Sequence, residues 1–277
     1  MSLRDILGGQ AVADYRGLGE IHHDGWGCSL LCAARDGSHP AAAAGPQPTR
    51  PGTRLYKTTI ESDRDPVFES LSCEAARGAL WHLRLASSHL PLIVENQQPF
   101  FANGLSFIHN GDISDDDGLN IITRRDEIVN DKVFLATGGR SDSAVFFAVI
   151  LEFLGFGFSL EESVVQAVKE LRGRYPKSSY NCMIQSDDLL VVLCAAGRTE
   201  VALRIIDIYD RYGRGEQAHD YRMIRYRPVH NGAGAEVGVV AASSGICESE
   251  GDGWRELANN QMLVASNRTG KYRVQSL

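Results

Sequence analysis

The clearest pattern in the sequence is a long apolar run near its middle. Residues 144–154 read AVFFAVILEFL, which is too long and too uniformly apolar for a strand and predicts a buried helix. Ser159–Glu162 form a capping box that opens a second helix, in which apolar residues recur at helical spacing from Leu160 to Leu171. The sequence therefore predicts a central pair of helices.

Short apolar or alternating runs predict strands on both sides of this pair, and two further helices precede it. Strands are expected at 23–34 after an initial turn, 53–60, 79–87, 105–109, 180–185, 189–196, 221–228, 237–244 and 262–266. The further helices are 4–17 and 65–78, with Gly78 as the stop, and surface segments are expected at 35–52 and 209–220. Strands and helices do not alternate strictly, which argues against a doubly wound parallel sheet and for an α+β fold. Two sheets packed between helix layers would satisfy this order, and no linker divides residues 1–277, so one domain is expected.

Composition and charge narrow the functional classes. The formal net charge is -7, which argues against nucleic acid as a main partner because phosphate binding needs a basic face. The first ten residues, MSLRDILGGQ, carry charge at once and have no apolar segment of signal-peptide length. No apolar run approaches the ~20 residues needed to cross a bilayer. We therefore expect a cytoplasmic protein that acts on a small molecule.

The cysteines and histidines give no sign of a metal or of disulfides. None of the six cysteines forms a C-x-x-C pair, and most lie in apolar stretches, so buried reduced thiols are expected. His22 and His23 are adjacent and diverge in a strand, and the sequence has no H-x-x-x-H pair. No metal and no cofactor are expected.

Three polar positions in apolar surroundings are candidates for chemistry. Arg84 stands on an apolar strand, where it needs a partner, either an internal acid or a bound carboxylate. Asn110-Gly111 end a strand, either as a turn with Gly111 at positive φ or as a pair of donors for an oxyanion. Asp142 precedes the central helix, either as its cap or as a carboxylate for a substrate ammonium. Taken singly, each structural interpretation is the stronger one.

These positions lie within a series of five motifs in chain order: D-G-W-G (24–27), H-x-R-x-A-S (82–87), N-x-x-P-F (96–100), F-x-H-N-G-x-I (107–113) and R-S-D-S (140–143). Taken together, the motifs resemble those of the class II glutamine amidotransferases of the N-terminal-nucleophile hydrolase superfamily, and the stand-alone bacterial branch above all. The resemblance runs over nearly the whole chain. It implies a four-layer αββα sandwich that forms a single glutaminase-like domain.

The resemblance also implies residue roles. Arg84 would bind the α-carboxylate of glutamine, and the Ser87 hydroxyl would support it. Asn110 and Gly111 would form the oxyanion hole, and Asp142 would bind the α-amino group. The strand would then stop at Asn-Gly and the helix would start at Asp because both ends face one glutamine pocket.

The sequence departs from the family at the nucleophile. The family uses a cysteine that becomes the first residue, with its own amine as general base, whereas no Cys precedes Cys28 here. Either the strand that bears the nucleophile is absent from this chain, or Ser2 is the nucleophile. The charged stretch LRDILGG argues against Ser2, because a buried strand is expected there. Gln98 and His89 also replace the family's usual His and Gly, which leaves the substrate open.

These observations predict an amide hydrolase of glutamine or of a γ-glutamyl small molecule, which is inactive if the terminal Cys is absent. Because the chain has no room for a synthase domain, an ammonia acceptor would lie on a partner chain, or the protein would be a simple hydrolase. The alternatives are an inactive amino-acid-binding scaffold and an N-terminal serine amidohydrolase. A homo-oligomer is left open.

Overall fold

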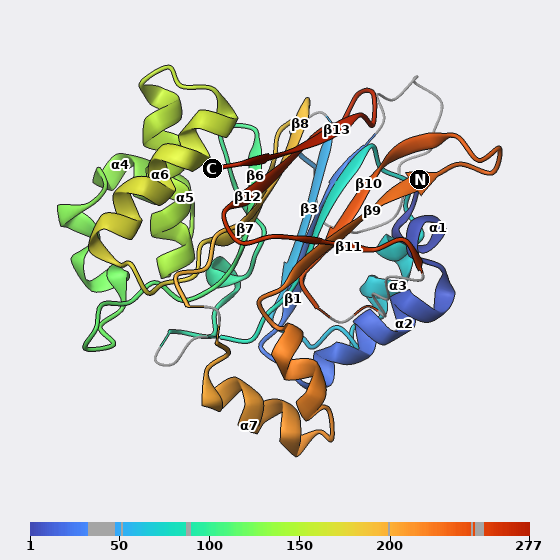
Figure 1. Cartoon of the computed structure of the whole chain (residues 1–277), viewed down its shortest axis with the longest axis horizontal. Helices are drawn as coiled ribbons and strands as arrows, with labels where there is room; N and C mark the ends of the chain where they lie inside the picture. The colour runs from blue at the N-terminus through green and yellow to red at the C-terminus, as the bar shows by residue number, and fades with distance from the viewer. Residues whose placement is uncertain (33–47, 51, 87–89, 199, 245, 247–251) are drawn as a thin grey trace.

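The computed structural model describes residues 1–32, 48–50, 52–86, 90–198, 200–244, 246 and 252–277 (Figure 1). The helices are α1 (Leu3–Leu7), α2 (Gly9–Gly17), η1 (Leu18–Glu20), α3 (Pro66–Ser72), η2 (Val94–Asn96), η3 (Ile121–Glu127), α4 (Asp131–Ala136), α5 (Asp142–Gly155), α6 (Leu160–Arg174), α7 (Leu203–Arg211) and η4 (Gly215–Asp220). The strands are β1 (Trp26–Leu31), β2 (Pro48–Arg50), β3 (Thr53–Thr58), β4 (Gly78–Leu83), β5 (Phe100–Ala102), β6 (Leu105–Asn110), β7 (Asn181–Gln185), β8 (Leu189–Cys194), β9 (Ile224–His230), β10 (Glu236–Ala242), β11 (Arg255–Leu257), β12 (Gln261–Ser266) and β13 (Tyr272–Ser276).

The described strands form three sheets in which neighbouring strands run antiparallel. Their orders are β2-β3-β1-β4, β10-β9-β11 and β13-β12-β8-β7-β6-β5. The expected α+β mixture of helices and sheets is confirmed, and the structure shows that the sheets are antiparallel. The apolar faces of these sheets must be buried against helices or against another sheet.

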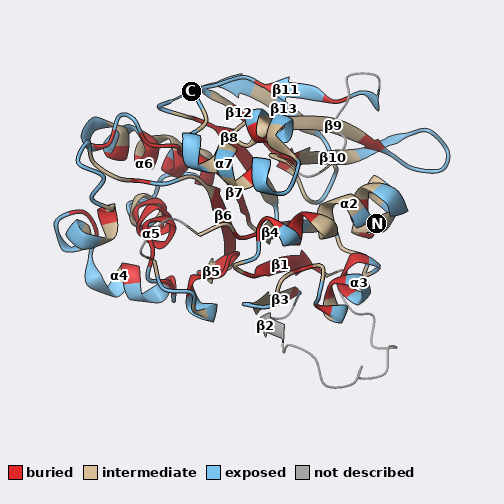
Figure 2. Cartoon of the chain, turned by 90° about the horizontal axis from the view of Figure 1, so that it is seen from below, coloured by how far each residue is buried: buried red, intermediate tan, exposed pale blue. Residues whose placement is uncertain are grey.

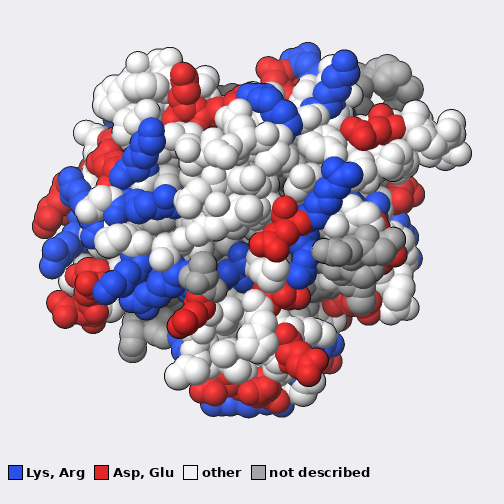
Figure 3. All heavy atoms as spheres, in the orientation of Figure 1, with Lys and Arg blue, Asp and Glu red and all other residues white. Residues whose placement is uncertain are grey.

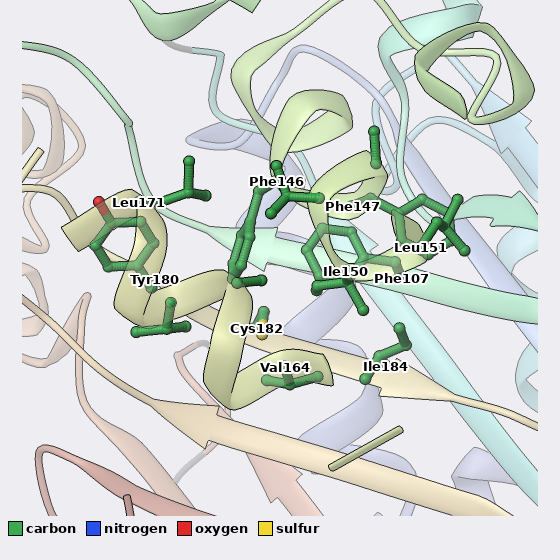
Figure 4. Packing of buried hydrophobic residues seen from close by; sticks show 14 of the residues in the cluster. Phe107, Phe146, Phe147, Ile150, Leu151, Val164, Leu171, Tyr180, Cys182 and Ile184 are labelled. Carbon is green, nitrogen blue, oxygen red and sulfur yellow. The ribbon is translucent and has the colours of Figure 1, made fainter. Parts of the chain in front are cut away.

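Helices α5 and α6 cover one face of the six-stranded sheet (Figures 1 and 4). The contact is aromatic: the rings of Phe107 on β6 and Phe147 on α5 stack with centroids 5.0 Å apart, and Phe146 meets Phe107 edge-on. Residues 144–151 of α5 are all nearly inaccessible, which explains why this helix shows no polar face. Both central helices and the capping box at Ser159 are confirmed.

The opposite face of the six-stranded sheet meets the other two sheets. Along β8, Val191 packs in the helix-side core whereas Val192 packs with Ile224 of β9, as the two-residue period of a strand requires. Toward β6, the Ser29 hydroxyl of β1 lies 2.6 Å from the Ser106 hydroxyl. The four-stranded sheet thus contacts this face at β6.

A second group of helices covers the outer face of the four-stranded sheet. Trp26 of β1 is fully buried and packs against Phe68 of α3 and Trp81 of β4. Residues from α2 and α7 complete this core. Figure 2 shows β1 buried and α3 exposed on its outer side. Trp26 is therefore a core residue, as the sequence indicated.

Three expected elements differ from the structure. The helix expected over 4–17 is divided because Gly8 has φ 83°, which ends α1 before α2 begins. The helix expected over 65–78 ends at Ser72, since the Arg77 N–H already donates to Leu31 O in the sheet. The expected loop over 209–220 begins in α7 and continues into η4, with Tyr209 buried.

In the part of the chain that the structure describes, no helix has the length and apolar character to cross a membrane. Figure 3 shows acidic and basic side chains interspersed on one face of the molecule.

Candidate functional site

Arg84 directly follows β4. Its backbone N–H donates to Gly25 O at 2.9 Å, so the pairing with the β1 side continues through this residue. The side chain is 5% exposed, and Nη1 has no hydrogen-bond partner among the described residues. Burial lowers the pKa of the guanidinium, and the carboxylates of Asp24 and Asp142 oppose that effect. The described residues provide no ion pair for Arg84, which leaves its charge available to a ligand.

Asp142 is the first residue of α5 and is not its cap. Ser141 is the N-cap, with its hydroxyl accepting from the Ala144 N–H, which corrects the interpretation of Asp142 as a capping residue. The Asp142 carboxylate is 2% exposed and accepts from the Ile113 N–H at 3.0 Å. Burial, followed by the nearby Asp112 carboxylate, raises the pKa of Asp142 to about 7. The site therefore holds a carboxyl group whose charge a cation would stabilise.

Asn110 ends β6 and is already engaged through its amide nitrogen. Nδ2 donates to Tyr221 O at 3.1 Å and to the Ser243 hydroxyl at 3.2 Å, while Oδ1 is buried without a partner. A role as oxyanion donor stays a prediction, and it requires Nδ2 to release one of these two acceptors.

Gly111 is a glycine because of close packing and not because of its φ. It is absent from the residues at positive φ, which corrects the turn interpretation. A Cβ built there would lie 2.4 Å from Ser179 O and 2.7 Å from His109 Nε2. Any side chain at Gly111 would force this corner apart.

His109 holds β6 to the start of α5. Its Nδ1 lies 2.9 Å from the Ser143 hydroxyl, its Nε2 lies 2.8 Å from Ser179 O, and its backbone N–H donates to Gln98 Oε1. Burial lowers the pKa of His109 to about 4, so the ring is neutral near pH 7. This polar network fixes Asn110 relative to Asp142.

Arg84, Asn110, Gly111 and Asp142 line one cavity of about 1020 Å³. Three segments that are remote in the sequence thus contribute to one cavity. Ser87 lies outside the described residues. The Ser2 hydroxyl accepts from the Asp5 N–H and caps α1, and Met1, but not Ser2, is among the lining residues.

Sequence reasoning missed several polar residues of the cavity. His82 of β4 lines the cavity, and its Nδ1 has no partner in the described structure. It stands two residues before Arg84, so the two-residue period of a strand places both side chains on the same side. Tyr221 and Ser243 contact Asn110 from a distant part of the chain. The period of β4 could have revealed His82, but no local signal marks the other two.

Cys182 brings a thiol to the cavity wall. Burial raises its pKa, which disfavours the thiolate needed for nucleophilic attack. Among the described residues, no group of three or more His, Cys, Asp or Glu side chains has an arrangement that could hold a metal ion.

No model of a protein family matches the sequence, and no curated protein matches it. Solved structures do share the fold. A glutamine aminotransferase class-II domain protein from Silicibacter pomeroyi is 17% identical with a TM-score of 0.54, over 91% of both chains. The glutamine phosphoribosylpyrophosphate amidotransferase of B. subtilis is 17% identical with a TM-score of 0.55, over 98% of this chain and 47% of that one.

A third structure, an allosteric regulatory enzyme of purine biosynthesis, is 17% identical with a TM-score of 0.53, over 95% of this chain and 45% of that one. The chain spans about half the length of these two larger enzymes. The resemblance to class II glutamine amidotransferases is thereby confirmed for the fold.

Proposed function

Because the chain has the fold of class II glutamine amidotransferase domains, we propose that it is a glutamine amidotransferase-like domain or a γ-glutamyl amide hydrolase. The observation that carries this proposal is the convergence of a buried guanidinium, a buried carboxyl group and an Asn-Gly corner on one cavity. The proposed architecture is the four-layer αββα sandwich within a single domain over residues 1–277. The proposed setting is the cytoplasm.

Arg84 and Asp142 provide opposite charges for the two charged groups of an amino acid. The Arg84 guanidinium pairs with the α-carboxylate, which satisfies its free Nη1. The Asp142 carboxylate pairs with the α-ammonium, and this cation lowers the raised pKa of Asp142. The side-chain amide of glutamine then extends toward Asn110 and Gly111, with Ser87 as the supporting hydroxyl.

The proposed reaction is attack of an amino-terminal nucleophile on the side-chain amide carbonyl. The attack forms an acyl-enzyme, the amide nitrogen takes a proton and departs as ammonia or an amine, and water then releases the glutamyl product. Asn110 and Gly111 stabilise the oxyanion. Ammonia would pass to an acceptor on a synthase partner chain, or the protein would act as a hydrolase alone. Ser2 is the weaker nucleophile candidate because its hydroxyl caps α1.

A binding scaffold is the second candidate function. The observation that favours it is the state of Cys182, the thiol at the cavity wall. Burial raises the pKa of this thiol, which disfavours the thiolate that nucleophilic attack would need. Such a protein would bind the amino acid without turnover.

Calorimetric titration with L-glutamine, together with measurement of ammonia release, tests these proposals. L-glutamine should bind, and D-glutamine and γ-aminobutyramide, which lacks the α-carboxylate, should bind at least ~30-fold more weakly, because a lost charge-assisted contact costs about 2 kcal/mol. Equal affinity for all three compounds would contradict the glutamine site. Binding without ammonia release favours the scaffold, and activity that Ser2→Ala removes favours the serine nucleophile.

A further inference from the structure

Two asparagines at the paired ends of β6 and β7 hold a distant segment of the chain against the candidate site. Asn110 and Asn181 are opposite each other in the two strands. Asn110 Nδ2 donates to Tyr221 O at 3.1 Å, and Asn181 Nδ2 donates to Arg222 O at 2.8 Å. Asn181 is buried and its Oδ1 accepts from the Ala195 N–H at 2.8 Å, so this anchor is itself fixed. The backbone of Arg222 therefore lies beside Asn110.

The Arg222 side chain brings a second arginine to the same part of the cavity. Its Nη1 donates to Arg198 O and to Glu200 O, both at 3.2 Å, which ties the segment after β8 to the segment before β9. Arg198 and Arg222 both line the cavity, and so does Arg204, near the start of α7. Burial lowers the pKa of Arg222, and the charge of Arg198 also lowers it. The two guanidinium groups are thus close enough to repel each other.

The acids near these two arginines do not neutralise them. Neither Arg198 nor Arg222 forms an ion pair within the described residues. Asp116 lies within electrostatic reach of Arg198, but it pairs with Lys177 at 2.7 Å. Asp112 acts on Arg222 less strongly than Arg198 does. Because neighbouring like charges are stabilised by an opposite charge between them, this part of the cavity favours an anionic ligand.

The two arginines lie beyond the amide end of the proposed ligand. Under the proposed function, the amino-acid end of the substrate pairs with Arg84 and Asp142, and its side-chain amide extends toward Asn110. Asn110 in turn contacts the carbonyl of Tyr221, the residue before Arg222. A group attached to the amide nitrogen would therefore continue toward the two guanidinium groups. Free glutamine carries only hydrogen atoms on that nitrogen and has no group to place there.

We propose that Arg198 and Arg222 form a subsite for an anionic group on the amine portion of the substrate. The preferred substrate is then a γ-glutamyl amide with a negative charge beyond its amide nitrogen, as in a γ-glutamyl amino acid. This inference rests on the proposed function and narrows its substrate class. Arginine suits the role because its planar guanidinium binds a carboxylate through two N–H groups and keeps its charge when it is partly buried.

The test is calorimetric titration of the 277-residue chain with L-glutamine, γ-glutamylglycine and γ-glutamylglycinamide. The last two compounds differ only at the glycine carboxylate, which is a neutral amide in the second. γ-Glutamylglycine should bind at least about fivefold more tightly than γ-glutamylglycinamide, because the carboxylate gains charge-assisted hydrogen bonds at a partly buried arginine. Equal affinity for these two compounds overturns the inference.

Substitutions test whether the two arginines cause this preference. Arg198→Met and Arg222→Met should each reduce the preference for γ-glutamylglycine over γ-glutamylglycinamide to about twofold or less, because a cation is lost. Arg198 is exposed, so its substitution leaves the core contacts in place even if Arg222→Met loosens the segment after β8. Arg64→Met, at an exposed arginine outside the cavity, is the control and should keep the full preference. An unchanged preference in both cavity variants overturns the inference.

The same titrations separate the inference from the proposed function. Equal binding of L-glutamine and of both γ-glutamyl compounds contradicts the anionic subsite and leaves the glutamine site supported. If none of the three compounds binds, the proposed function is overturned together with the inference. Tighter binding of γ-glutamylglycine that the two cavity variants remove supports both.

Discussion

The Arg84 guanidinium and the Asp142 carboxyl group line one cavity, and in the described part of the chain no ion pair joins them. Arg84 follows the end of β4, whereas Asp142 begins α5. Leaving two buried ionisable groups without an ion pair costs stability. Such a cost is typical of a site that a charged ligand completes.

Arg84→Met should separate binding from stability. The substitution removes an incompletely bonded buried guanidinium, so the free energy of unfolding should stay unchanged or rise by about 1–3 kcal/mol. Affinity for L-glutamine should fall at least ~30-fold, because a charge-assisted contact is lost. Urea unfolding and calorimetry measure the two effects. Arg64→Met, at an exposed arginine, is the control. Unchanged glutamine affinity in Arg84→Met would contradict the assigned role.

Glutamine affinity should depend on the ionisation of Asp142. With its pKa raised to about 7, the free protein has mostly neutral Asp142 at pH 5, and the ligand ammonium needs the ionised form. Because the apparent affinity scales with the competent fraction, the dissociation constant should rise on the order of 100-fold from pH 8 to pH 5. Asp142→Asn should bind weakly at both pH values. A flat affinity profile for the unmodified chain would count against this role.

The ionisation of Asp142 should also affect the free energy of unfolding. This stability should fall as pH rises, whereas glutamine affinity should increase. The folded pKa of Asp142 is raised above its usual 3.8, so protonation favours the folded state, and this contribution is lost as pH rises from about 4 to 7. Asp142→Asn should therefore stabilise the ligand-free protein at pH 8, on the order of 1–3 kcal/mol, and have little effect at pH 4. Urea unfolding at both pH values measures this. Equal effects at both would show that another group governs the dependence.

Gly111→Ala should destabilise the site corner. The added Cβ would lie 2.4 Å from Ser179 O, so the backbone must shift, at a cost of about 1–3 kcal/mol. Gly173→Ala in α6 is a matched control, because a Cβ there meets nothing within 4 Å and Ala favours a helix by about 1 kcal/mol. Thermal unfolding should thus give shifts of opposite sign. A neutral Gly111→Ala would contradict the close packing.

Buried histidines should make the fold sensitive to acid. Burial lowers the pKa of His22 and His109 to about 4, so below pH 6.5 the unfolded chain binds protons that the folded chain does not. Each should lower stability by about 1.4 kcal/mol per pH unit between about 6 and 4. His22→Gln should remove one such contribution, and His230→Gln, at an exposed position, is the control. Proton uptake on unfolding at pH 5 measures the difference.

Local patterns predicted most of the elements. The apolar run at 144–154 and the capping box at Ser159 gave both central helices, because each signal lies within one element. α7 was missed because its last three residues, from Tyr209, and the polar sequence after them were interpreted as a surface loop, although Tyr209 is buried. The reason for glycine at position 111 was also missed, since Ser179 O approaches from a segment that is remote in the sequence, just before β7.

The sequence predicted several residues of the site but not the neighbours that surround them in space. Arg84 and Asp142 stand out because charged groups interrupt apolar stretches. Tyr221 and Ser243 carry no such mark, and they meet Asn110 only because β9 and β10 return to this part of the fold. β4 and β10 are separated by more than half of the chain and yet line the same cavity. Such a long-range arrangement is not encoded in the periodicity of either strand.

β4 is an edge strand of the four-stranded sheet and β10 is an edge strand of the three-stranded sheet, and these edges affect how readily the protein aggregates at high concentration. A row of free N–H and C=O groups is a template for any extended chain, and neighbouring molecules carry such chains. Apolar residues that line the cavity beside these edges, such as Ile108, Met183 and Leu190, would stabilise such pairing between molecules. Purification at low concentration, or with a strand-forming peptide that shields these edges, is therefore the condition under which this chain should resist aggregation.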